Sequence, residues 1–230
     1  MKMYRAAAIA AAIALLAGCG SKTAPPAPPA SGAAEAPPEI PVMGPEIPIV
    51  ALGDSLFAGY GLKDGESYPA QLERALRARG INARIANAGV SGNTTAEGLE
   101  RLAFTVDNQP VKPALVIVSL GGNDMLRGLP PAQARANLDS ILSELDRRKI
   151  PAVLMGMMAA PNLGADYARQ FNAIYPDLAK KHHAALVPFF LQAVTGKPDL
   201  IQPDHVHPTA PGVTEIVAAT IDTVAAAAKK

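Results

Sequence analysis

The amino-acid sequence predicts a three-layer α/β/α sandwich, in which helices cover both faces of a doubly wound parallel sheet of about five strands. Short, almost wholly apolar runs alternate along the chain with longer stretches in which apolar residues recur every three to four positions. Apolar runs of this kind are typical of strands buried on both faces, and the longer stretches are typical of amphipathic helices. Regular alternation of the two favours right-handed crossovers between parallel strands.

Five apolar runs, rich in Val, Ile, Leu and Ala, are the predicted strands. They lie at residues 47–52, 83–88, 114–120, 152–158 and 185–190. Each is about as long as an ordinary strand. Five such strands separated by helices predict a flavodoxin-like sheet, whose ligands bind at the carboxyl ends of the strands.

The helices between these strands carry their own start and stop signals. Leu138, Ile141, Leu142 and Leu145 lie on one face of a helix. Another helix has a proline in its first turn and a glycine after its end, and a third begins with a capping box. These signals are Pro69, Gly80 and the pair Thr94 and Glu97. The last helix is expected to begin at Thr209 and to run to about Ala228.

Residues 1–18 are predicted to be a secretory signal. Lys2 and Arg5 precede an apolar stretch that is too short to span a bilayer. The stretch ends in Leu16-Ala17-Gly18-Cys19, which resembles a bacterial lipobox. That resemblance implies lipid modification of Cys19, a membrane anchor in the cell envelope and, in a Gram-negative organism, the periplasmic face of the outer membrane. The alternative is an ordinary signal peptide with an incidental cysteine.

Residues 19–46 are predicted to be a tether between the lipidated cysteine and the folded domain. Prolines recur here among Ala, Gly and Ser, from Pro25 to Pro45. Proline fixes φ and removes a backbone donor, so the segment cannot form a helix or a central strand. The folded domain is therefore expected to span residues 47–230.

Composition excludes several functional classes. The formal charge of +1, which becomes slightly negative without Lys2 and Arg5, argues against nucleic-acid binding. A single cysteine excludes an intramolecular disulfide and a zinc finger. Asp204, His205 and His207 lack a further cluster with ligand spacing, so we expect no metal. His182 and His183 end a predicted helix, where a cation favours the helix dipole, and they are expected to lie at the surface.

Polar blocks follow the predicted strands at the points where a ligand site is expected. They are Gly53-Asp54-Ser55-Leu56, Asn87-Ala88-Gly89-Val90-Ser91-Gly92, Gly121-Gly122-Asn123-Asp124 and Asp204-His205-Val206-His207-Pro208. Each block alone has an ordinary explanation as a cap or turn. Together, in this order and spacing, they resemble the SGNH (GDSL) hydrolase superfamily. The resemblance is closest to its arylesterase, thioesterase I and lysophospholipase L1 branch, and it covers nearly all of residues 47–226.

The resemblance implies a site whose chemistry can be checked residue by residue. Ser55 is the implied nucleophile, His207 its base and Asp204 the residue that orients the base; a serine hydroxyl needs such a base to become reactive. The backbone N–H groups of Ser55 and Gly89 and the amide of Asn123 are the implied oxyanion donors. His205 is expected to point away from His207 and to lie outside the triad. No cofactor is implied.

The resemblance also implies the substrate. Met125, Leu126, Leu129 and Pro161 are expected to line an acyl pocket, whereas Met155, Met157 and Met158 are expected in the core. The expected reaction is hydrolysis of aryl or short- to medium-chain acyl esters, lysophospholipids or acyl thioesters by a monomer. Alternatives are a carbohydrate or cell-wall O-acetylesterase and a non-catalytic, tethered binding lipoprotein. Asn93 stands where the branch usually has an acidic residue, and its effect is not predicted.

Overall fold

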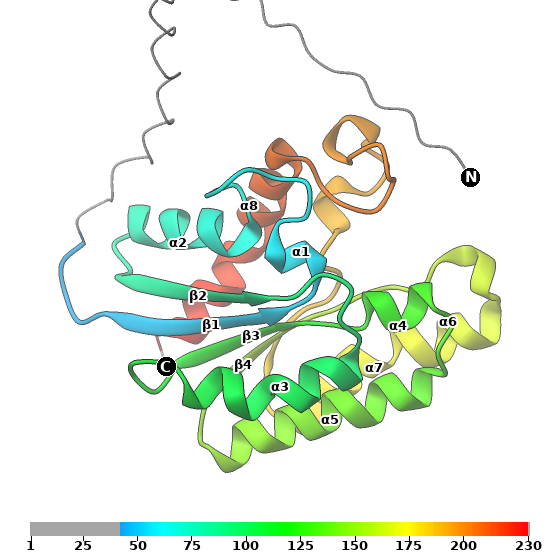
Figure 1. Cartoon of the computed structure of the whole chain (residues 1–230), viewed down its shortest axis with the longest axis horizontal. Helices are drawn as coiled ribbons and strands as arrows, with labels where there is room; N and C mark the ends of the chain where they lie inside the picture. The colour runs from blue at the N-terminus through cyan, green and yellow to red at the C-terminus, as the bar shows by residue number, and fades with distance from the viewer. Residues whose placement is uncertain (1–41, 230) are drawn as a thin grey trace, which may run out of the picture. The chain divides into compact units, whose positions relative to one another are not determined.

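A parallel five-stranded sheet organises the part of the chain that the computed structural model describes, residues 42–229 (Figure 1). The strand order is β2-β1-β3-β4-β5, the flavodoxin-like order. The strands are β1 Ile47–Gly53, β2 Ala83–Gly89, β3 Leu115–Ser119, β4 Ala152–Met155 and β5 Ala185–Val187. The predicted fold class is confirmed. The predicted signal peptide, Cys19 and nearly all of the predicted tether lie outside the described residues.

Helices cover both faces of the sheet. In Figure 1, α2 (Tyr68–Ala78) and α8 (Ala210–Ala228) lie on one face, and α3 (Thr95–Asp107) and α5 (Pro131–Arg147) lie on the other. The remaining elements are α1 Ser55–Ala58, α4 Gly122–Leu126, α6 Ala165–Asn172, α7 Ile174–Lys181 and the 3-10 turns Pro161–Leu163, Gln192–Val194 and Pro198–Leu200. No helix within residues 42–229 is long and apolar enough to cross a membrane.

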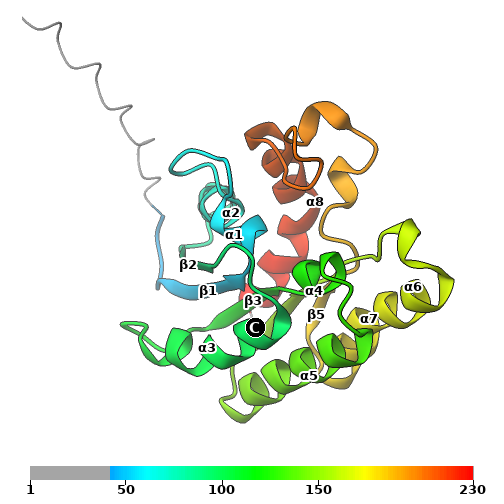
Figure 2. The ribbon, with the colours of Figure 1, turned by 45° about the vertical axis from the view of Figure 1, so that its right-hand side comes forward.

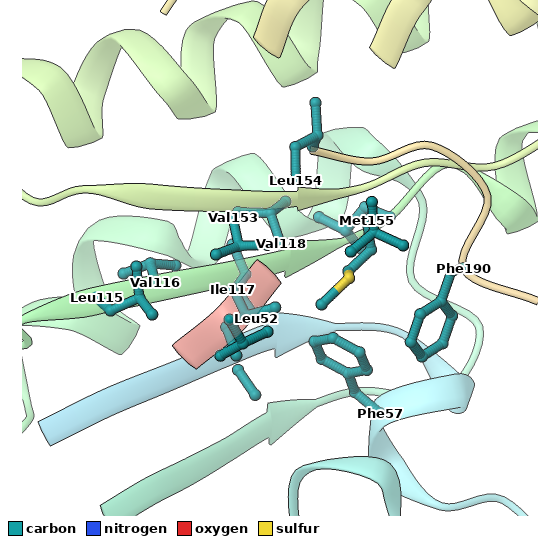
Figure 3. Packing of buried hydrophobic residues seen from close by; sticks show 14 of the residues in the cluster. Leu52, Phe57, Leu115, Val116, Ile117, Val118, Val153, Leu154, Met155 and Phe190 are labelled. Atoms are coloured by element: carbon teal, nitrogen blue, oxygen red, sulfur yellow. The ribbon is translucent and has the colours of Figure 1, made fainter. Parts of the chain in front are cut away.

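The core is centred on β1, β3 and β4. Every residue of β3 is buried, as the wholly apolar run predicts. Figure 3 shows Leu52 and Ile117 packed near Met155, with Phe57 and Phe190 closing the same end of the core. Full burial of each such side chain contributes about 1.5–3 kcal/mol, so this layer holds the strand ends that carry the polar blocks.

The local helix signals are found where the sequence places them. Thr94 and Glu97 form a reciprocal capping box at the start of α3. Pro69 lies in the first turn of α2, and Gly80 follows the end of α2 with a φ of 76°. Thr209 caps α8 from outside, so α8 begins one residue later than expected.

Two predicted strands end earlier than their apolar runs. β4 ends at Met155 and β5 at Val187, so residues 156–158 and 188–190 are not strand. Beyond these ends, the Gly156 N–H donates to the Val187 carbonyl and the Phe190 N–H donates to the Gly156 carbonyl. A Cβ at position 156 would lie 2.2 Å from the carbonyl oxygen of Pro188, so only glycine allows the two connections to come this close.

The prediction for His182 is wrong. Its ring is only 6% exposed and lies between two carboxylates of α5. Nε2 is 2.6 Å from Asp139 Oδ1, and Nδ1 is 2.5 Å from Asp146 Oδ2. These partners lie far away in the sequence, so the helix-end pattern did not reveal them. His183 is exposed, as predicted.

Candidate active site

The polar blocks meet at the carboxyl end of the sheet. Ser55 begins α1 directly after β1, and Asn123 lies in α4 shortly after β3. Figures 1 and 2 show α1, α4 and the loop before α8 at the end of the sheet to which the strands point. Ligands of doubly wound sheets bind at this end.

Ser55, His207 and Asp204 form a chain of hydrogen bonds. The Ser55 hydroxyl lies 2.8 Å from His207 Nε2, and His207 Nδ1 lies 2.7 Å from Asp204 Oδ2. A carboxylate accepts only, so Nδ1 donates to Asp204 and Nε2 is left to accept from the hydroxyl. The structure thus brings together the three residues that the sequence pattern implies, with the imidazole in the tautomer that a base requires.

The base loop, residues 202–208, is shaped largely by its own hydrogen bonds. Asp204 Oδ1 accepts from the N–H groups of Val206 and His207, each at 3.0 Å. The His207 N–H bond, with smaller contributions from the Val206 N–H and the imidazole, lowers the pKa of Asp204 to about 2. The Gln202 N–H donates to the His207 carbonyl, which closes the loop.

Tyr60 and Gln202 join the base loop to the segment after α1. The Gln202 side-chain amide donates to the carbonyls of Tyr60 and Pro208, at 2.8 and 2.9 Å. The Tyr60 ring lies against the His207 ring, with 4.6 Å between the centroids. Tyr60 therefore limits the positions that the His207 ring can take.

Asp54 is a site residue that the sequence reasoning missed. Its side chain is buried and caps α1 by accepting from the Leu56 N–H at 3.0 Å. Its other oxygen lies 3.4 Å from the amide nitrogen of Asn123. Burial raises the pKa of Asp54 to about 6, although the Leu56 N–H bond and the nearby His207 oppose the rise. An aspartate immediately before a short helix is a capping signal that could have identified it.

Asn123 lies in the site, held by its neighbours. Its amide nitrogen donates to the Asn93 carbonyl at 3.0 Å, while the contact with Asp54 is long for a hydrogen bond. The Asn93 side chain accepts from Arg101 Nε at 2.7 Å, and another Arg101 nitrogen donates to the Gly53 carbonyl. The neutral residue at position 93 therefore orients Arg101 by a hydrogen bond and adds no charge beside the site.

The expectation for Gly89 is wrong. Its N–H donates to the Asn87 side chain at 2.9 Å and is not available to a substrate. Glycine is needed at position 89 for packing, because a Cβ there would lie 2.2 Å from the backbone nitrogen of Ala58. Within residues 42–229, the N–H groups of Ser55 and Gly92 donate to no other group. The free Gly92 N–H is also close to Asn123 along the structure, because the carbonyl of the next residue, Asn93, accepts from the Asn123 amide.

A cavity of about 280 Å³ adjoins Ser55, and we call it the catalytic hollow. Met125 and Leu126 line it as predicted, but Leu129 and Pro161 do not. The Leu129 carbonyl instead accepts from Tyr167, and Pro161 is exposed, while its neighbour Ala160 lines the wall.

Two methionines beyond β4 also line the catalytic hollow, because β4 ends at Met155. Met157 is 5% exposed and belongs to the core, as expected, whereas Met158 is 47% exposed and does not. His205 has a φ of 60°, so the turn is not extended, and His205 lines the hollow without joining the triad. Among residues 42–229, no group of three or more His, Cys, Asp or Glu side chains has an arrangement suited to a metal ion.

Comparison with known proteins defines the class. Residues 51–214 match the GDSL-like Lipase/Acylhydrolase family. Esterase TesA of Pseudomonas aeruginosa is 39% identical over 160 residues, which are 70% of this chain and 79% of that protein. The arylesterase of Vibrio mimicus is 38% identical over 173 residues, 74% of this chain and 86% of that protein. The chain therefore belongs to the GDSL-like lipase/acylhydrolase family.

Solved structures agree. AlinE4, described as an SGNH-hydrolase family esterase, is 68% identical, with a TM-score of 0.70 over 80% of this chain and 98% of that chain. A structure of TesA is 36% identical, with a TM-score of 0.73 over 77% of this chain and 97% of that chain. An acetyl-xylooligosaccharide esterase is 21% identical and shares the fold alone. The suspected superfamily is confirmed, and the chain is a serine-esterase member of it.

Proposed function

We propose that this esterase hydrolyses carboxylic esters through an acyl-Ser55 intermediate, with Ser55, His207 and Asp204 as its catalytic triad. The observation that carries the proposal is the 2.8 Å contact between the Ser55 hydroxyl and His207 Nε2, with Asp204 on the other ring nitrogen. A serine hydroxyl becomes a nucleophile when a positioned base accepts its proton.

Acylation follows from this arrangement. Ser55 Oγ attacks the ester carbonyl as its proton moves to His207 Nε2, and Asp204 stabilises the imidazolium that forms. The carbonyl oxygen gains negative charge in the tetrahedral intermediate. When the intermediate collapses, the imidazolium gives its proton to the departing alcohol, and the acyl group remains on Ser55. Water then attacks the acyl-serine with the same base, releasing the carboxylic acid and restoring the hydroxyl.

Three neutral N–H donors are in position to stabilise the oxyanion by hydrogen bonds. These are the Ser55 N–H, the Asn123 side-chain amide and, in place of Gly89, the N–H of Gly92. Support for Gly92 comes from its unused N–H and from the contact of its neighbour Asn93 with Asn123. Neutral donors stabilise a developing anion without the cost of burying a counter-charge. One such donor typically lowers the activation free energy by ~2.7–4 kcal/mol.

The proposed substrates are aryl and short- to medium-chain acyl esters, and also lysophospholipids and acyl thioesters. The names of the relatives, arylesterase and thioesterase 1/protease 1/lysophospholipase L1, support this range. The catalytic hollow, with Leu56, Met125 and Met157 in its wall, supports an apolar acyl group. The reaction as written needs no cofactor.

The test is covalent labelling with a serine-directed alkyl phosphonate, followed by peptide mapping. Label on Ser55, with stoichiometric loss of p-nitrophenyl butyrate hydrolysis, is the expected result. Active protein that carries no label, or label on another residue, would refute the mechanism. The non-catalytic alternative predicts no hydrolysis at all.

We also propose that Cys19 anchors the mature chain to a membrane of the cell envelope by its lipid. The sequence Leu16-Ala17-Gly18-Cys19 and the proline-rich residues after it support this proposal. Several acyl chains on one residue suffice for stable anchoring. Labelled palmitate should enter the full chain expressed in Escherichia coli and should be absent from the Cys19→Ser variant. Incorporation that survives this substitution would contradict the proposal.

A further inference from the structure

Two of the three proposed oxyanion donors come from different segments of the chain. The Gly92 N–H belongs to residues 90–94, between β2 and α3, which we call the oxyanion turn, and the Asn123 amide belongs to α4. Figures 1 and 2 show α4 beside the start of α3. The spacing between the two donors therefore depends on the contacts that join α4 to this turn.

Two of these contacts reach the turn itself. The Asn123 amide donates to the Asn93 carbonyl at 3.0 Å, and the Arg127 guanidinium donates to the Gly92 carbonyl at 2.7 Å. Arg127 is exposed, so water competes for its hydrogen bond. One exposed contact and one amide bond do not by themselves fix α4 against the turn.

A buried contact lies directly after the turn. Asp124 Oδ2 accepts from the Thr95 N–H at 2.8 Å, and Asp124 Oδ1 accepts from the Thr95 hydroxyl at 2.6 Å. Asp124 is 1% exposed and Thr95 is 0% exposed. A carboxylate that accepts two hydrogen bonds from one residue fixes direction as well as distance, and exclusion of water strengthens both bonds. We call this contact the Asp124–Thr95 bridge.

The bridge joins the two segments that carry the donors. Thr95 follows the oxyanion turn, and Asp124 follows Asn123. Asp124 does not line the catalytic hollow and takes no part in the proposed acylation. An effect of Asp124 on the reaction must therefore pass through Asn123 or through the turn.

We propose that the Asp124–Thr95 bridge positions Asn123 for oxyanion stabilisation, with Asp124 as a positioning residue. The inference rests on the esterase function proposed above. An amide carries two N–H groups: one of those of Asn123 donates to Asn93, and the other has only the long 3.4 Å contact with Asp54. While the bridge holds α4 in place, this second N–H is left to donate to the oxyanion. Misplacement of such a group by ~1 Å can cost about a hundredfold in rate.

The test weakens the bridge without removing a proposed oxyanion donor. Thr95→Val keeps the shape of the side chain and the backbone N–H bond but loses the hydroxyl, and Thr95→Ser restores the hydroxyl. Asp124→Ala is an independent second variant that removes the acceptor of both bonds. Asn137→Ala is the matched control, because its amide donates to the same Thr95 hydroxyl at 3.0 Å from α5 and is not part of the bridge. Steady-state kinetics on p-nitrophenyl butyrate give kcat and KM separately, at a temperature where circular dichroism shows each variant to be folded.

We expect kcat to fall at least about tenfold in Thr95→Val and in Asp124→Ala, with KM changed less than about threefold, because the weakened interaction is made only in the transition state. Thr95→Ser and Asn137→Ala should stay within about threefold of wild type in kcat. Wild-type kcat in both folded bridge variants, or a loss in Asn137→Ala equal to that in Thr95→Val, would overturn the inference.

A second readout separates positioning from stability. In the Asn123→Ala background, Thr95→Val should lower kcat by less than about twofold, because the side chain that the bridge positions is no longer present. A general loss of stability would instead lower kcat by the same factor in both backgrounds, and that result would overturn the inference. Wild-type protein that hydrolyses no p-nitrophenyl butyrate, or that takes up no phosphonate label on Ser55, would refute the proposed function, so the two failures are distinct.

Discussion

Two carboxylates flank the reacting groups, and the fold treats them in opposite ways. Asp54, next to Ser55, is 2% exposed, and burial raises its pKa to about 6. Asp204, three residues before His207, has a side chain that is 36% exposed, and backbone N–H bonds lower its pKa to about 2. The nucleophile side of the site, Asp54 and Ser55, is thus attached to the sheet core. The base side, residues 202–208, is a solvated loop that is stabilised by local hydrogen bonds.

This contrast teaches where the rigidity of the site comes from. Ser55 is fixed because β1 and α1 are fixed, and a change there acts on packing as well as chemistry. His207 is fixed by Asp204, Gln202 and Tyr60, which are few contacts in a wetter environment. Substitutions on the nucleophile side are therefore expected to have larger effects than substitutions of the same kind in the base loop.

The largest effect is expected for Ser55→Ala. Removal of the nucleophile should lower kcat/KM for p-nitrophenyl butyrate roughly ten-thousandfold, because the oxyanion donors alone give only residual catalysis. The thermal midpoint should stay close to wild type, since Asp54 still caps α1. A variant that keeps more than a few per cent of the activity would show that another group attacks the ester.

The next largest effect is expected for Asn123→Ala. Loss of one oxyanion donor should lower kcat roughly a hundred- to a thousandfold with a much smaller change in KM. Asn137→Ala is the matched control, because that amide donates to the Thr95 hydroxyl away from the reacting atoms. Steady-state kinetics of both variants test this prediction. Equal losses of kcat in the two variants would mean that Asn123 affects only the stability of the fold.

Asp54→Asn tests the buried carboxylate through pH. Because the folded pKa is raised from 3.8 to about 6, ionisation opposes folding above pH 6, and the penalty vanishes below pH 4. Asparagine cannot ionise. The stability of the variant relative to wild type should therefore rise between pH 4 and pH 8, by on the order of 2–3 kcal/mol. Urea unfolding across this range measures it, and parallel curves for the two proteins would disprove the burial argument.

The same variant separates two causes of activity loss in mild acid. A protonated general base cannot accept the serine proton, which lowers kcat/KM, and protonation of Asp54 near pH 6 can lower it too. We expect the acidic limb of the kcat/KM profile to persist in Asp54→Asn, because the proposed base is His207. Loss of the acidic limb in the variant would show that protonation of Asp54 causes the fall in kcat/KM.

The smallest effect is expected for Asp204→Ala. Water can enter the space of an exposed carboxylate and accept from His207 Nδ1, so kcat/KM should fall only about tenfold, less than for Asn123→Ala. Asp166→Ala, on the exposed side of α6, is the control. Loss comparable to that of Ser55→Ala would show that the base loop is as rigid as the nucleophile side and would remove the contrast.

Most of the fold could be predicted from local sequence patterns, because the positions of strands and helix starts depend largely on neighbouring residues. The five strands follow from continuous apolar runs, and the caps at Thr94 and Thr209 follow from side chains next to the helices they start. The pattern misleads at two strand ends. Met157 and Phe190 continue apolar runs but lie beyond the ends of β4 and β5, where Met157 lines the catalytic hollow and Phe190 packs against Phe57 and Tyr68.

The site was predicted as far as the chain order of its motifs allows. Ser55, Asn123 and the pair Asp204 and His207 lie together as the family resemblance implies. Gly89 failed because its N–H is engaged by Asn87, a contact that spacing does not reveal. His182 failed because both of its partners come from α5, and contacts between distant helices leave no mark in a local window.

The position of the reacting pair along the chain has a consequence for biosynthesis. Ser55 and His207 are separated by 152 residues, so the nucleophile is made early and its base almost last. A growing chain already carries the serine but no group to activate it. In the proposed mechanism, hydrolysis begins only when the final segment has docked, so a chain that lacks this segment leaves esters intact.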